Sequence, residues 1–134
     1  MYKPIKFVTK INYKDFSTYY LYCKPLKTLL PVETSEDKPF PSSTNTLKRL
    51  INALGGKIKY LKIYRYDQSN FYTYLNVEKS GSSYDVNISF KDGMDVVRDS
   101  CIPIYADEKI LTNFGFEVTE ELVKKALTEN ENYL

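Results

Sequence analysis

The feature that most constrains the fold is a change of hydrophobic period at Gly55-Gly56. Before these glycines, apolar residues recur at the spacing of one helix face: Leu47, Leu50, Ile51 and Leu54. After them, three segments alternate apolar and polar side chains and are separated by two turn-forming stretches: residues 57–66, 71–79 and 83–90. The pattern predicts a helix that begins near Ser43 and ends at the glycines, followed by a three-stranded β-meander.

The flanking segments predict further strands and helices. β-branched and aromatic residues indicate three strands before the helix, at 5–13, 17–24 and 27–33, and two prolines indicate a loop at 34–42. After the meander we expect a helix at 91–99, a strand at 102–105, a short helix at 106–113 and a C-terminal helix at 119–130. Strands outnumber helices without a βαβ order, so we expect one α+β domain over residues 1–134 with a mixed or mainly antiparallel sheet.

Composition limits the chemistry that the chain can perform. It contains no histidine, which removes the commonest general base and every Ser-His or Cys-His pair. The two cysteines, Cys23 and Cys101, cannot complete a structural zinc site without carboxylates, so each is predicted to be a small buried residue. Any reaction must therefore use carboxylates, Lys, Tyr or a bound metal, and we expect no organic cofactor.

Charge and hydropathy bear on location and partners. The formal net charge of +2 is too small to indicate nucleic-acid binding by itself. Residues 1–30 carry six lysines and one acid, whereas residues 107–134 carry seven acids and three lysines; this asymmetry fits subunit contacts, a polyanion or a solvated surface. No apolar run could span a bilayer and the N-terminus lacks a signal-peptide core, so we expect a soluble, cytoplasmic protein without a membrane partner.

An acidic helix supplies the first candidate site. On a helix over 91–99, Asp92, Asp95 and Asp99 project from one face, and Met94 and Val97 project from the opposite one. Carboxylates are hard ligands that suit Mg²⁺, and a bound cation can activate water for phosphodiester hydrolysis. The alternative is a solvated helix face on which Asp92 stabilises the N-terminal turn.

A basic, tyrosine-rich strand supplies the second candidate. Strict alternation over 57–66 places the side chains on two faces, with Lys57, Lys59 and Arg65 on one and Tyr60, Lys62, Tyr64 and Tyr66 on the other. Cations for phosphates beside rings for bases are what a single-stranded nucleic-acid surface needs. The candidate nucleic-acid-binding residues are Lys57, Lys59, Lys62, Tyr64 and Arg65, and the alternative is that the tyrosines pack in the sheet.

Two further apolar patterns predict burial. Tyr19 and Leu21 share one face of their strand and Tyr20 and Tyr22 share the other, which indicates a core on one side and a partner subunit on the other. The C-terminal helix carries an apolar stripe that could cover a sheet edge or a neighbouring chain: Leu122, Val123, Ala126 and Leu127.

Residues 41–115 resemble the bifunctional nuclease (BFN) domain family. Four features in order carry the resemblance: Ala53-Leu54-Gly55-Gly56, Phe71-Tyr72, Asp92 and Pro103-Ile104-Tyr105. The strands at 5–33 fit the N-terminal region of that family, with Leu29-Leu30-Pro31-Val32 in the place of an LPI segment. The resemblance implies an α+β domain that assembles into homo-oligomers, of which we favour a dimer, and that cleaves RNA or DNA.

The chain also departs from the family pattern at three polar positions. Ser89-Phe90-Lys91-Asp92 stands where Arg-Pro-Ser-Asp is usual, so the Asp remains and the Arg does not. Ser43-Thr44-Asn45 stands where Thr-His-Asp is typical of the family. The loop at 34–42 stands where the family has a further helix that carries a Glu. The resemblance implies hydrolysis assisted by a divalent cation, Mg²⁺ or Mn²⁺, with Asp92 as the catalytic residue and a metal ligand. The helical spacing adds Asp95 as a second predicted metal ligand. The alternative is a non-catalytic oligomeric module that binds a protein or nucleic acid through its tyrosine-rich surface.

Overall fold

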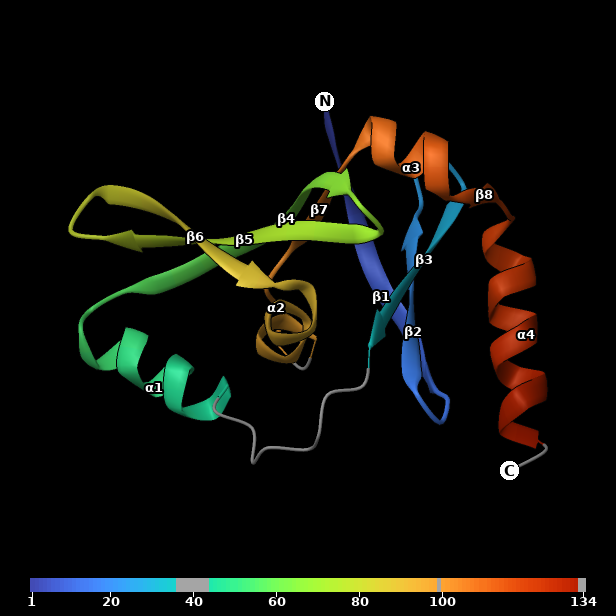
Figure 1. The fold of residues 1–134 in the computed structure, drawn as a ribbon, viewed down its shortest axis with the longest axis horizontal. Coiled ribbons are helices and arrows are strands. Elements are labelled where there is room, and N and C mark those ends of the chain that lie inside the picture. The colour runs from blue at the N-terminus through green and yellow to red at the C-terminus, as the bar shows by residue number, and fades with distance from the viewer. Residues whose placement is uncertain (36–43, 99, 133–134) are drawn as a thin grey trace.

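The computed structural model describes residues 1–35, 44–98 and 100–132 of the chain (Figure 1). In these residues the chain forms one eight-stranded mixed sheet and four helices, which confirms the predicted α+β class. The strands are β1 (Tyr2–Asn12), β2 (Phe16–Cys23), β3 (Thr28–Ser35), β4 (Lys57–Asp67), β5 (Asn70–Lys79), β6 (Ser82–Ser89), β7 (Ile104–Asp107) and β8 (Phe116–Glu117). The helices are α1 (Thr44–Ala53), α2 (Phe90–Val97), α3 (Glu108–Phe114) and α4 (Glu120–Asn132).

The strand order across the sheet is β6-β5-β4-β7-β1-β2-β3-β8. Neighbouring strands are antiparallel except β4 and β7, which pair in parallel. β7 reaches its place through α2, and it joins the predicted meander β4–β6 to the N-terminal strands β1–β3. Strand β6 therefore lies at one edge of the sheet, and the two-residue β8 lies at the other.

The core lies between the sheet and α2. Met94, Val96 and Val97 of α2 are almost completely buried, as are Leu61 and Leu75 of the strands beneath them. The helix approaches closely because residue 93 is glycine: a Cβ atom there would lie 2.9 Å from Cδ1 of Leu61. The burial of Met94 and Val97 confirms the predicted apolar face of this helix.

The predicted elements agree with the structure except at a few ends. β3 continues through Ser35, which pairs with Phe16, so the predicted loop begins later than expected. Most of that loop, and the expected helix start at Ser43, lie outside the described residues. β8 was not predicted, because two residues are too few to show an alternating pattern.

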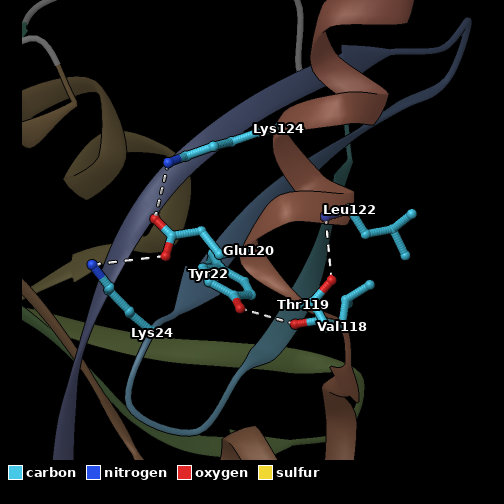
Figure 2. A network of polar contacts seen from close by, with 7 residues as sticks. All are labelled: Tyr22, Lys24, Val118, Thr119, Glu120, Leu122 and Lys124. Atoms are coloured by element: carbon cyan, nitrogen blue, oxygen red, sulfur yellow. Dashed lines mark hydrogen bonds and ion pairs between the residues drawn. The ribbon is translucent and has the colours of Figure 1, made fainter.

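The far face of β2 is covered by the chain itself at Tyr22. The Tyr22 hydroxyl donates a hydrogen bond of 2.9 Å to the carbonyl oxygen of Val118, and the side chain is 7% exposed. Just beyond it, the Glu120 carboxylate lies 3.7 Å from the Lys24 ammonium and 3.6 Å from that of Lys124 (Figure 2). Tyr19 and Leu21 are fully buried on the opposite face, as predicted, but the partner subunit expected over Tyr22 is not needed to bury it.

Helix α4 contacts the sheet through its first turn. Leu122 is 53% exposed and Ala126 is exposed, whereas Val123 is half-buried, so the described part of the chain covers the predicted apolar stripe only in part. The side chain of Leu127 lies outside that part. No helix in the described residues is both long enough and apolar enough to span a membrane.

The two cysteines differ in burial. Cys23 is fully buried beside the core, as predicted. Cys101 is exposed, so the prediction for it was wrong, because it lies in the turn that leads from α2 to β7.

Candidate nucleic-acid interface

Strand β4 contains two irregularities that decide which side chains share a face. Its pairing with β5 shifts between Ile58 and Tyr60 and again between Ile63 and Arg65. Lys59 and Tyr64 therefore have no directly opposed residue on β5. Such bulges insert one unpaired residue and restart the alternation behind it.

The bulges bring the basic and aromatic residues of β4 together. Directly opposed residues of two strands lie on the same face. The opposed pairs are Lys57 with Glu78, Tyr60 with Asn76, Lys62 with Tyr74 and Arg65 with Tyr72. Alternate residues of β5 share a face, so all four pairs project from one side of the sheet. The predicted separation of Lys57, Lys59 and Arg65 from the tyrosines was therefore wrong, because strict alternation takes no account of bulges.

Tyr66 was predicted to share a face with Tyr60, Lys62 and Tyr64, but it lies on the other face of the sheet. Its ring lies 4.0 Å from that of Phe114 and 4.8 Å from that of Phe71, measured between centroids. Phe114 belongs to α3, so Tyr66 packs on the face that the helices cover. The second bulge shifts the alternation by one residue and separates Tyr66 from the other tyrosines of its strand.

Lys62 lies at the centre of a group of rings. Its ammonium nitrogen is 3.9 Å from the ring centroid of Tyr2, 5.3 Å from that of Tyr60 and 5.9 Å from that of Tyr74. Distances of this size permit cation–π attraction. Two further rings adjoin the group: Tyr105 lies 5.7 Å from Tyr60, and Tyr64 lies 5.3 Å from Tyr74.

These rings come from four neighbouring strands, β1, β4, β5 and β7. We call this surface the tyrosine face and define it by Tyr2, Tyr60, Lys62, Tyr64, Tyr74 and Tyr105. All five predicted nucleic-acid-binding residues lie on this side of the sheet, since Lys59 contacts Glu78 and Tyr64 contacts Tyr74.

The tyrosine face is turned away from α1, α2 and α3. α2 packs on Leu61 and α3 on Tyr66 and Phe71, while α1 and Leu75 line a common groove. All of these contacts are made on the opposite face, because Leu61, Tyr66, Phe71 and Leu75 alternate with the residues of the tyrosine face along β4 and β5. The rings of the tyrosine face are consequently half-buried among themselves and partly open to solvent.

Carboxylates partly balance the cations of β4. Lys59 lies 3.5 Å from a Glu78 carboxylate oxygen, and Arg65 donates to Asp67 at 2.8 Å. Lys57 and Lys62 form no ion pair within the described residues. Among the cations of β4, these two lysines are therefore the most readily available to a bound anion.

Hydrogen bonds fix the neighbouring part of the surface. The amide nitrogen of Asn76 donates to Asp85 at 2.8 Å and to Ser83 at 2.6 Å. The Tyr64 hydroxyl donates to the Asn87 side-chain oxygen at 3.2 Å. Because these partners belong to different strands, they hold β4, β5 and β6 in a fixed arrangement on this face.

Two phenols on this face, those of Tyr2 and Tyr74, remain protonated at neutral pH. Burial raises the pKa of Tyr74 above 10.0, and the Asp85 carboxylate and the neighbouring rings raise it further. Burial and Tyr74 also raise the pKa of Tyr2, which the nearby Lys62 ammonium opposes. These two hydroxyls are thus available as hydrogen-bond donors for phosphate or base oxygens.

The predicted catalytic residue lies elsewhere. Asp92 is exposed in the first turn of α2, and its backbone N–H donates to the Ser89 hydroxyl at 3.2 Å. Its side chain lines a groove of about 480 Å³ between α1 and the β5–β6 hairpin. The groove is apolar, and Lys79 is the other charged residue among the described residues that line it.

The two predicted metal ligands, Asp92 and Asp95, both belong to α2. Asp95 is half-buried one turn after Asp92, and Asp99 lies outside the described residues. Within the described residues, no three His, Cys, Asp or Glu side chains form a cluster suited to a metal ion. The groove lies on the helix-covered face, so Asp92 and the tyrosine face are on opposite sides of the sheet.

Sequence reasoning missed Tyr2, Tyr74 and Tyr105 as members of this surface. Alternation within 71–79 could have indicated Tyr74 as a cross-strand neighbour in the meander. No local pattern indicates that β1 and β7 lie beside β4, because that placement depends on pairing between distant segments. Neither a scan against protein-family models nor a search of curated proteins finds a match to this chain.

Proposed function

We propose that this protein binds single-stranded RNA or DNA on its tyrosine face. The observation that carries the proposal is the gathering of rings from four strands around Lys62 on a sheet face turned away from α1, α2 and α3. Every base has a flat apolar face, and each base that stacks on an aromatic side chain contributes about 1 to 3 kcal/mol. Lys57 and Lys62 supply positive charge for the backbone phosphates.

The charge balance predicts that stacking contributes more than electrostatics. Lys59 and Arg65 are engaged by Glu78 and Asp67, so two lysines neutralise phosphates at first contact. For single strands, two such contacts give a slope of about −1.4 in a plot of log K against log salt concentration. We therefore expect weak salt dependence and tolerance of different sequences.

Metal-assisted hydrolysis of RNA or DNA remains a second proposal, which rests on the resemblance and on the exposed position of Asp92. The site around Asp92 offers no second carboxylate at the groove among the described lining residues. This arrangement favours the non-catalytic alternative, in which Asp92 stabilises its own helix.

The test is binding of labelled single-stranded RNA and DNA, measured by fluorescence anisotropy. Tyr74→Ala should weaken binding by roughly 5- to 150-fold, the equivalent of one stacked base. Lys62→Gln should weaken it and make the salt slope shallower by about 0.7. Matched controls are Tyr13→Ala and Lys125→Gln, because both residues are exposed and lie outside the tyrosine face.

The two proposals can be separated in the same samples. Cleavage is followed with Mg²⁺, with Mn²⁺ and with chelator, for wild type and Asp92→Asn. Binding that Tyr74→Ala and the controls reduce equally would refute the tyrosine face as the binding surface. Metal-dependent cleavage that Asp92→Asn abolishes would establish the second proposal.

A further inference from the structure

Strand β6 is an edge strand that has one charged side chain, Asp85, and otherwise lacks the features that usually protect an edge. It pairs with β5 over all eight residues from Ser82 to Ser89 with no shift of register. Its sequence, SSYDVNIS, contains no lysine and no proline. Soluble proteins commonly use lysine, proline, bulges or short length to block edge-to-edge pairing. In the described residues no strand pairs with the outer side of β6.

The side chains of β6 also leave apolar surface exposed. Tyr84 is 55% exposed and Val86 is 49% exposed, and both line the groove beside α1. On the other face of the strand, Asp85 and Asn87 border the tyrosine face through their bonds to Asn76 and Tyr64. The edge therefore has an apolar side and a polar side.

We propose that two copies of this chain associate by antiparallel pairing of their β6 strands about a twofold axis at Val86. The axis is perpendicular to the sheet, so that the two tyrosine faces lie on the same side. Each unpaired backbone N–H and C=O along the edge then gains a partner from the second copy. The partner is a second copy because the strand is complementary to itself in this register.

The side chains select the register. Two arrangements pair nearly the whole strand, one centred on Asp85 and one centred on Val86. Centring on Asp85 places two carboxylates directly opposite each other, which is destabilising. Centring on Val86 places Val86 opposite its own copy, Tyr84 opposite Ile88, and Asp85 opposite Asn87. In the second arrangement the apolar residues face apolar residues, and the carboxylate faces an amide that can donate to it.

Pairing in this register has two structural consequences. The two sheets become one continuous sheet, and the tyrosine faces of both copies form a surface suited to a longer single strand. On the other side, Tyr84 and Val86 of each copy cover the open wall of the other groove.

Disulfide trapping tests both the association and its register. The native exposed cysteine is first removed by Cys101→Ser. In this background, Val86→Cys places two thiols opposite each other at the axis and should form a covalent dimer on mild oxidation. Tyr84→Cys is the matched control: its two copies are displaced by four residues, or about 14 Å along the strands. A disulfide requires Cα atoms within about 7 Å.

Sedimentation equilibrium provides an independent measurement. Wild type should be a dimer that dissociates on dilution, and Val86→Lys should be a monomer because it places two ammonium groups at the axis. Leu122→Lys changes an apolar residue of similar exposure on α4 and should leave the dimer intact. Circular dichroism establishes that each variant is folded.

A charge exchange tests the pairing of Asp85 with Asn87. Asn87→Asp places two carboxylates opposite each other at each end and should weaken the dimer at least tenfold. Adding Asp85→Lys to that variant should restore the strength of the dimer, because lysine then faces aspartate. Three results would overturn the proposal: a wild type that stays monomeric at its solubility limit, equal trapping by Val86→Cys and Tyr84→Cys, or a dimer that Val86→Lys and Asn87→Asp leave unchanged.

Discussion

Replacing Tyr22 by Phe isolates the hydrogen bond that joins the segment before α4 to the sheet. The hydroxyl donates to the Val118 carbonyl at 2.9 Å from a side chain that is 7% exposed, and phenylalanine keeps the ring (Figure 2). A neutral hydrogen bond of this kind contributes about 1 kcal/mol to the free energy of unfolding. With an unfolding entropy of about 2.1 cal/mol/K per residue, this loss lowers Tm by about 3 to 4 °C for a domain of this size.

The pH dependence of the stability difference between wild type and Tyr22→Phe provides a second test. Burial raises the pKa of Tyr22 above 10.0 in the folded chain, and the adjacent Glu120 carboxylate and Cys23 raise it further. Between the unfolded and folded values the folded chain holds more protons than the unfolded chain, so wild-type stability falls as pH rises. Tyr22→Phe lacks this titration, so the advantage of wild type should be complete below pH 10 and shrink above it.

The assay is urea unfolding followed by circular dichroism at several pH values. Tyr13→Phe is the control, since Tyr13 is 46% exposed and its substitution should change stability by less than about 0.5 kcal/mol. Tyr2 and Tyr74 also have raised pKa values, but they are present in both chains and cancel in the difference. The reasoning fails if Tyr22→Phe is as stable as wild type at neutral pH, or if the difference stays constant above pH 10.

Three substitutions in and beside α2 test the account of that helix, each by urea unfolding. Gly93→Ala should lower the free energy of unfolding by about 0 to 2 kcal/mol. Crowding against Leu61 costs about 1 to 3 kcal/mol, and the better helix propensity of alanine offsets about 1 kcal/mol of this cost. A clear gain in stability would contradict the close approach of α2 to β4. Ser89→Ala should lower the free energy of unfolding by about 1 kcal/mol, since it removes the acceptor for the Asp92 N–H. An unchanged urea midpoint would show that this cap contributes nothing. Asp92→Asn should lose about 0.3 to 1 kcal/mol at low salt and leave nucleic-acid affinity unchanged, so weaker binding in the anisotropy assay would contradict a purely structural role.

The order and type of the elements could be read from the sequence because local features mark them. Gly55 and Gly81 both have φ of 81°, a backbone conformation that favours glycine, and they end α1 and form the β5–β6 turn. The apolar face of α2 was also predictable, since Met94 and Val97 follow the helical period. These assignments depend on residues that are close in sequence.

The composition of the tyrosine face could not be predicted in the same way. Nothing in KIKYLKIYRY marks Lys59 or Tyr64 as the extra residue of a bulge, because neither position is a glycine. Without the bulges, the cations and the rings appear to lie on opposite faces. Tyr2 and Tyr105 join the surface only because β7 pairs with both β1 and β4, and such pairing between distant segments leaves no local pattern.

The separation of the two candidate sites by the sheet sets a condition on any hydrolysis. A strand bound to the tyrosine face contacts Lys62 and its rings, whereas Asp92 lines the groove on the other face. A catalytic group must reach the reacting atoms within hydrogen-bonding distance or through one water molecule. Cleavage at Asp92 therefore requires a second binding mode in the groove, where Lys79 is the available cation among the described lining residues. If cleavage occurs by this route, Lys79→Gln should reduce it while Tyr74→Ala does not, and the opposite pattern would exclude the groove as the place of reaction.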